Sequence, residues 1–177
     1  MVTQSMRHDL LVHKLIPSAI DERTALHHAC ASGDFSEIKR IVGDAADAAS
    51  IVNVHDGFGR TPLDDAIVNG DEQIIAFLRQ HGARTGNSFD YVGKLISGAA
   101  QNDARMVQLL VGAGIDVNCH DYDRRPPLHV AVANGHEPVV RLLLAAGADV
   151  HSTDRWDVSP LNEAKALESR VGGTPIL

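Results

Sequence analysis

Aromatic side chains are scarce in this chain and make up 4% of its 177 residues. A core built from large rings is therefore excluded, although apolar residues reach 44% of the sequence. Small aliphatic side chains must fill the interior, which suits thin layers that approach closely and contact only their neighbours. We therefore expect alanine-rich helices in close contact.

Clusters of basic residues are also missing, and the formal net charge is −7. A protein that reads nucleic acid needs grouped lysine and arginine side chains to displace counterions from the phosphates. The composition therefore predicts that this chain does not bind nucleic acid. The acidity is typical of a well-solvated surface.

Cysteine is rare, and the two residues present, Cys30 and Cys119, form no Cys-x-x-Cys motif or disulfide framework. This usage is typical of a reducing compartment. The apolar stretch 10–12 is interrupted by His13 and Lys14, so it is too short for a signal-peptide core or a membrane span. We expect a cytoplasmic protein without direct membrane insertion.

Motifs for catalysis, cofactors and metals are incomplete. Segment 57–62 begins like a dinucleotide loop but lacks the third glycine and a preceding long apolar strand. Segment 136–140 begins like a zinc-protease motif, yet Val140 stands where the second histidine is needed. We predict no catalytic, cofactor or metal site, and we expect Asp64 and Asp65 to form an acidic spot on a concave surface.

What the chain does contain is an internal repeat. One pattern begins five times with leucine, at intervals of 37, 32, 33 and 33 residues: Leu26, Leu63, Leu95, Leu128 and Leu161. A small residue follows at plus three: Ala29, Ala66, Gly98, Ala131 and Ala164. A turn-forming residue follows at plus seven: Gly33, Gly70, Asn102 and Gly135. With apolar residues at plus twelve and plus fifteen, the pattern predicts two short helices per repeat, joined by a turn that favours positive φ.

Glycine recurs at plus nineteen as well, at Gly82, Gly114 and Gly147, where a left-handed residue would end the second helix. The first repeat departs from this pattern because segment 44–50 inserts about four residues. We expect a longer surface loop there.

Four segments, 24–27, 61–64, 126–129 and 159–162, resemble the Thr-Pro-Leu-His signature of ankyrin repeats. The resemblance covers residues 21–170. It implies an all-α ankyrin-repeat solenoid of five helix-turn-helix repeats, the last truncated, with β-hairpin fingers between repeats. Residues 1–20 are expected to form an N-terminal capping helix, and residues 171–177 a C-terminal tail.

We define the fingers as the segments between helix pairs: first, 53–60; second, 84–92; third, 118–125; fourth, 151–158. The third and fourth are similar to fingers in the ankyrin segments of glutaminases, plant potassium channels and ankyrin-containing kinases. Those fingers have glycine where this chain has Arg124 and Asp157, and a residue with a Cβ resists positive φ. The resemblance also assigns His27 and His129 to tying neighbouring turns together through ring-nitrogen hydrogen bonds.

Most of the few aromatic residues lie in or beside the fingers: Phe58, Phe89, Tyr91, Tyr122 and Trp156. Protein interfaces favour aromatic and arginine side chains as anchors. The predicted partner-binding residues are Phe58, Arg60, Tyr122, Arg124, Arg125, Arg155 and Trp156. The alternative is that each ring packs on the adjacent finger.

The resemblance implies a non-enzymatic interaction module, scaffold or adaptor that binds another protein through its fingers and concave helix face. The alternative is a regulatory or assembly module of a larger enzyme or ion channel, so that the partner is the rest of a longer chain. Asn118 also resembles the asparagine that asparaginyl hydroxylases modify in ankyrin repeats. The structural alternative is that Asn118 only bonds the backbone of the finger.

Overall fold

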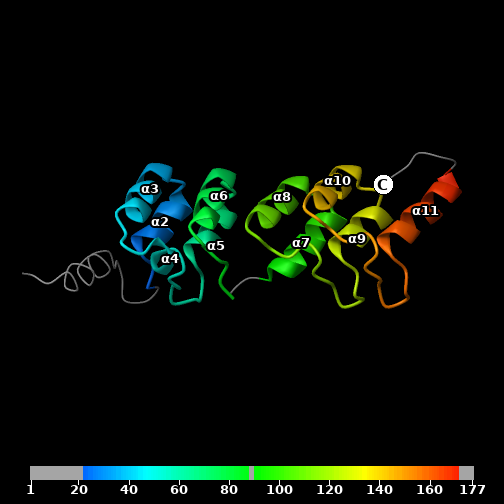
Figure 1. Cartoon of the computed structure of the whole chain (residues 1–177), viewed down its shortest axis with the longest axis horizontal. Coiled ribbons are helices and arrows are strands. Elements are labelled where there is room, and N and C mark those ends of the chain that lie inside the picture. The colour runs from blue at the N-terminus through cyan, green and yellow to red at the C-terminus, as the bar shows by residue number, and fades with distance from the viewer. Residues whose placement is uncertain (1–21, 88–89, 172–177) are drawn as a thin grey trace, which may run out of the picture. The chain divides into compact units, whose positions relative to one another are not determined.

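The computed structural model describes residues 22–87 and 90–171 (Figure 1). Within these segments every regular element is a helix and no β-strand forms, as the all-α prediction requires. The predicted capping helix at 1–20 and the predicted tail after Val171 lie outside the described residues. The chain divides into two compact units, residues 1–89 and 90–177, which are described in turn.

The described part of the first unit consists of helix pairs followed by turns. Its helices are α2 (Ala25–Ser32), α3 (Phe35–Gly43), α4 (Ala48–Ile51), α5 (Pro62–Asn69) and α6 (Glu72–Gln80). Helix α2 pairs with α3 and α5 with α6, while α2 and α5 pack side by side as the first helices of consecutive repeats. This is the layered arrangement that the repeat pattern predicts.

The second unit is built in the same way. Its helices are α7 (Tyr91–Ala100), α8 (Ala104–Gly112), α9 (Pro127–Ala133), α10 (Glu137–Ala145) and α11 (Pro160–Val171). Helix α7 pairs with α8 and α9 with α10, and α9 packs between α7 and α11. Helix α11 is the first helix of the fifth repeat, and the described residues contain no second helix to pair with it.

The repeat register places its leucines in the core. Leu26, Leu63, Leu95 and Leu128 are at most 2% exposed, and the small residues at plus three are buried beside them. Gly98 shows why that position is small, because a Cβ there would lie 3.1 Å from Cγ2 of Val107. Leu161 of α11 is only half-buried.

The predicted turns have the predicted backbone. The plus-seven residues all have positive φ: Gly33 at 74°, Gly70 at 74°, Asn102 at 57° and Gly135 at 69°. The plus-nineteen glycines likewise have φ of 81° (Gly82), 85° (Gly114) and 88° (Gly147). Both sets stop their helices in the left-handed conformation that glycine, and after it asparagine, adopts most readily.

Two details differ from the sequence prediction. The inserted segment 44–50 leads into helix α4, whose first turn is capped by Asp47, so it is not purely a loop. Helix α7 begins at Tyr91 because Asp90 caps it, accepting a hydrogen bond from the N–H of Gly93. The second finger is therefore shorter than 84–92, and Tyr91 is buried on a helix instead of lying beside a finger.

None of the helices in the two described segments combines the length and the apolar character needed to cross a membrane.

Candidate functional site

The first, third and fourth fingers share one turn, and each is closed by an aspartate: Asp56, Asp121 and Asp154. In each, Oδ1 accepts the backbone N–H groups of the residues two and four positions later, at 2.8–3.0 Å. The aspartate's own N–H donates to the carbonyl four residues on, at 2.8–3.1 Å. These bonds give the fingers a tight hairpin-like turn, although no strand forms within the described residues.

The fourth residue of each turn has a left-handed backbone. Gly59 has φ of 74°, while Arg124 and Asp157 have φ of 60° and 59°. The two side chains therefore do not prevent the glycine-like turn, and the bonds accepted by the leading aspartates hold it closed. The three fingers have one shape and differ in the side chains they carry.

Three of the rings named from the sequence point into solvent: Phe58 is 63% exposed, Tyr122 93% and Trp156 58%. A guanidinium group accompanies two of them. Arg60 lies 5.5 Å from the centre of the Phe58 ring, and Arg155 lies 4.6 Å from that of Trp156. Tyr122 therefore does not pack on a neighbouring finger, and Phe58 and Trp156 each keep more than half of their surface open to solvent. Phe89 lies outside the described residues.

The four predicted arginines differ in what they already bind. Arg60 pairs with Asp56 at 2.9 Å, and Arg125 pairs with Asp121 at 3.1 Å, so both brace their own finger. Arg155 bonds Asp123 of the preceding finger at 2.6 Å. Exposed Arg124 forms none of these ion pairs. The sequence did not distinguish the arginines that brace a finger from those that point outward, and binding of a partner by these residues stays a prediction.

Three cross-links join the third finger to the fourth finger and to the residues just before it. At one end Oδ1 of Asn118 accepts the N–H of Asp149 at 2.8 Å. In the middle Nε2 of His120 lies 3.3 Å from the hydroxyl of Ser152. Towards the tips the N–H of Arg155 donates to the carbonyl of Asp123 at 3.0 Å, beside the ion pair of the same residues.

Asn118 therefore has a structural role, and so does Asn53 in the first unit, whose Oδ1 accepts the N–H of Arg84 at 2.8 Å. Hydroxylation of Asn118 stays a prediction. Sequence reasoning missed the contact of Asp123 with Arg155 and that of His120 with Ser152. Both contacts join residues 32 positions apart, about one repeat, and this spacing could have indicated that the residues lie side by side.

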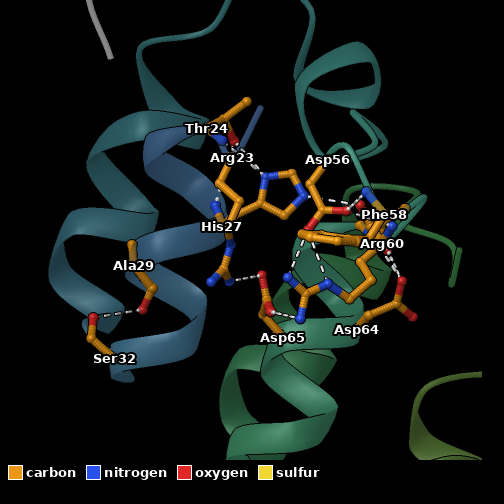
Figure 2. A network of polar contacts seen from close by, with 11 residues as sticks. Arg23, Thr24, His27, Ala29, Ser32, Asp56, Phe58, Arg60, Asp64 and Asp65 are labelled. Atoms are coloured by element: carbon orange, nitrogen blue, oxygen red, sulfur yellow. Dashed lines mark hydrogen bonds and ion pairs between the residues drawn. The ribbon is translucent and has the colours of Figure 1, made fainter. Parts of the chain in front are cut away.

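A polar network joins the first finger to helices α2 and α5 (Figure 2). His27 is fully buried, and its Nε2 donates to the carbonyl of Arg60 at 3.1 Å. Its Nδ1 accepts from the hydroxyl of Thr24 at 2.8 Å and from the N–H of Thr24 at 3.2 Å. His27 thus ties two consecutive repeats together, as predicted. Burial lowers its pKa despite the nearby carboxylates, which keeps the ring neutral for these bonds.

The two acidic residues of α5 belong to the same network and are not a surface spot, which corrects the prediction. Asp64 is fully buried and accepts from the N–H groups of Thr61 and Gly86 at 2.7 and 2.9 Å. Asp65, 5% exposed, pairs with Arg23 and lies 4.0 Å from Arg60 (Figure 2). Buried carboxylates need such partners, because charge without compensation is costly in the interior.

His129 occupies the equivalent position in the second unit but lacks these bonds. Pro126 stands where Thr24 stands before His27, and proline offers neither an N–H nor a hydroxyl. Nδ1 of His129 is consequently buried without a partner, and Nε2 lies 3.9 Å from Asp154, beyond hydrogen-bond range. The predicted tie through ring hydrogen bonds is therefore wrong for His129. Burial lowers the pKa of this ring too.

The leading aspartates of the first and fourth fingers are held as carboxylates. Burial raises the pKa of Asp56, but the hydrogen bonds donated by Arg60 and by the Phe58 N–H outweigh it, so the pKa is lowered overall. The pKa of Asp154 is lowered in the same way by the N–H groups of Val158 and Trp156. Both turns therefore depend on an ionised side chain.

The described residues offer little covalent chemistry. Burial raises the thiol pKa of Cys30 to about 12 and that of Cys119 to about 11, so both are protonated and unreactive at neutral pH. No group of three or more histidine, cysteine, aspartate or glutamate side chains in the described segments is arranged to hold a metal ion. In each unit the fingers present exposed rings and guanidinium groups on turns held closed by hydrogen bonds.

Comparison with known proteins agrees with this architecture. Residues 2–88 and 95–164 match the family model "Ankyrin repeats (3 copies)". The chain is 34% identical to potassium channel KOR1 of Oryza sativa subsp. japonica over 82% of its length, and 37% identical to potassium channel GORK of Arabidopsis thaliana over 79%. It is also 47% identical over 41% of its length to the serine/threonine-protein kinase VIK of Arabidopsis thaliana.

These relatives are much longer than the matched region. The chain covers 20% of each of the two channels and 17% of the kinase. The similarity therefore concerns a repeat region that occurs within larger proteins.

Proposed function

Because this chain belongs to the ankyrin repeat family, whose repeats are protein-interaction modules, we propose that its partner protein binds to the exposed finger residues and the adjoining concave helix face. The observation that carries the proposal is the exposure of Phe58, Tyr122 and Trp156, three large rings in a chain with few aromatics. Exposure of rings of this size to water is unfavourable, and covering them with a partner lowers the free energy.

The surrounding structure supports this role. The turn bonds of the leading aspartates and the cross-links between the third and fourth fingers hold the rings in place before binding. A preorganised surface loses little conformational entropy on association. The chain acts as an adaptor in the cytoplasm, and its own contribution is binding without catalysis.

The test is affinity capture from native lysate with the chain and with a variant carrying Phe58→Ala, Tyr122→Ala and Trp156→Ala. Circular dichroism establishes that both are folded, and Arg105→Ala, an exposed change on α8, serves as the control. We expect a protein that the chain and the control retain and the triple variant loses. Equal retention by all three proteins would exclude the rings as anchors.

A second candidate is a regulatory or assembly module of a larger enzyme or ion channel. Its support is the potassium channels, of which the matched region is one fifth. In that case the partner is another part of the same polypeptide. Sequencing the complete transcript tests this: a reading frame that continues into a channel or enzyme domain supports the module, and a frame confined to these 177 residues excludes it.

A further inference from the structure

In the third and fourth fingers, the arginine side chains are more exposed to solvent than the carboxylates they pair with. Four aspartates and three arginines nearly balance in number: Asp121, Asp123, Asp154, Asp157, Arg124, Arg125 and Arg155. Arg124 and Arg155 are exposed, the latter with 48% of its side chain, and Arg125, which braces its own finger, still exposes 39% of its side chain. The carboxylates of the two leading aspartates are largely occupied by the turns they close.

Asp123 receives two guanidinium groups at once. Arg155 reaches one of its oxygens at 2.6 Å, and Arg125 reaches the other at 3.5 Å. One carboxylate cannot satisfy two groups that carry five N–H donors each. Open donors therefore remain at this point, and Arg124, beside Asp123 in the chain, adds a third guanidinium that these ion pairs do not include.

Rings flank these donors on both fingers. Tyr122 is nearly fully exposed on the third finger, and Trp156 is exposed on the fourth beneath the guanidinium of Arg155. Stacking on the indole and pairing with Asp123 both restrict the Arg155 side chain. A restricted, planar guanidinium is suited to bind a carboxylate through two parallel hydrogen bonds.

From this arrangement we infer that the third and fourth fingers bind an acidic peptide segment in which aspartate or glutamate stands next to an apolar side chain. The carboxylate pairs with Arg124 and Arg155, and the apolar side chain covers Tyr122 and Trp156. The inference rests on the proposed function and specifies its partner. Asp157 is the one outward carboxylate of the two fingers, and it opposes this binding.

The turn provides a matched pair of test variants. Arg124 and Asp157 occupy equivalent positions with almost the same φ, and asparagine tolerates that conformation. Arg124→Asn removes a positive charge, and Asp157→Asn removes a negative charge, with the same backbone demand in both. Tyr122→Ala tests the ring, and Arg105→Gln on α8 controls for a general loss of positive charge.

The experiment selects binders to the whole chain from a random peptide library displayed on phage, and then titrates the selected peptides as synthetic peptides. Trp156 is the only tryptophan in the chain, so its fluorescence reports binding at the fourth finger directly. We expect acidic residues next to leucine or an aromatic residue in the selected peptides. Arg124→Asn should weaken binding about threefold to tenfold and Asp157→Asn should strengthen it, while Arg105→Gln leaves it unchanged.

Selection of basic peptides would overturn the acidic partner, and so would reversed effects of the two asparagine variants. If selected basic peptides bound more weakly to Tyr122→Ala, the fingers would still be the binding surface, and only the proposed acidic chemistry of the partner would be wrong. Peptides indifferent to every finger variant, or no selected peptide at all, would overturn this inference. The lysate capture with the triple variant tests the proposed function separately.

Discussion

Arg124 and Asp157 adopt a backbone conformation that residues with a side chain rarely occupy, with φ of 60° and 59°. For an L-residue this conformation costs roughly 1–2 kcal/mol relative to the right-handed region. The cost is local and the surrounding turn bonds offset it. Neither residue is needed for the shape of its finger, because Gly59 gives the first finger the same turn.

Arg124→Gly should therefore raise the free energy of unfolding by about 0.5–1 kcal/mol, since glycine removes the strain while its larger unfolded-state entropy takes back part of the gain. Urea denaturation measures the change. Arg105→Gly, in the ordinary helical backbone of α8, should lower the free energy of unfolding by about 1 kcal/mol. If both changes lowered stability equally, the left-handed turn would be wrong.

Leu128 represents the four leucines that the repeat pattern places in the core, and it is fully buried. Leu128→Ala should cost about 2–5 kcal/mol through the cavity it leaves, and neighbouring repeats should unfold with it because each layer is stabilised by the next. Chemical denaturation followed by circular dichroism measures the loss.

Leu161→Ala is the matched control, because Leu161 begins the same pattern in α11 but is only half-buried. It should cost clearly less than Leu128→Ala. Equal losses at the two positions would contradict the burial difference, and an unchanged unfolding curve for Leu128→Ala would contradict the register itself.

At the level of elements, the start of the first helix decides how firmly each repeat is tied to the next finger. Thr24 caps α2 and also bonds His27, which reaches the carbonyl of Arg60 in the next repeat. Pro126 occupies the N-cap of α9 without a side-chain cap hydrogen bond, and it leaves Nδ1 of His129 without a partner. The tie through a buried histidine is therefore complete in the first unit and incomplete in the second.

Pro126→Thr should stabilise the chain by about 1 kcal/mol, because threonine restores a donor for Nδ1 and a side-chain cap for α9. The backbone of Pro126, with φ of −71°, is compatible with threonine, which has φ of −81° at position 24. Thermal denaturation measures the gain. The reverse change, Thr24→Pro, should lower stability, and a gain there or a loss at Pro126→Thr would refute the role of this bond.

At the level of the whole molecule, the buried titratable groups make stability depend on pH in one direction. His27 and His129 have folded-state pKa values below the ordinary 6.5, so below that pH the unfolded chain binds protons more readily and stability falls as the pH drops through the folded pKa values. Asp56 and Asp154 have folded pKa values below the ordinary 3.8, so their contribution is present above that value and is lost on further acidification.

Denaturant titrations across the pH range should therefore show a two-stage loss of stability on acidification: first below about pH 6.5 and again below about pH 4. His27→Gln should lower stability at neutral pH and flatten the first stage. The control is His28→Gln at the exposed neighbouring position. A first stage that His27→Gln leaves as steep as before would show that this histidine does not cause it.

The sequence alone determined the fold class and the register. Helix packing and backbone conformation impose local requirements on residue type. The sequence therefore shows them directly, in the period of the five leucines, the small residues beside them and the glycines at the turns. It also indicated which segments are fingers. Even the exception at Tyr91 has a local cause, an earlier helix cap at Asp90.

Only the tertiary structure decided which finger residues are available to a partner. The fingers contain four arginines in similar segments: Arg60, Arg124, Arg125 and Arg155. The ion pairs that each one forms decide whether it stabilises its own finger or points outward. The burial of Asp64 and Asp65 and the missing partner of His129 also depend on contacts between repeats, more than 20 residues apart in the chain. Such contacts depend on the distances between side chains in space, which a repeat pattern does not specify.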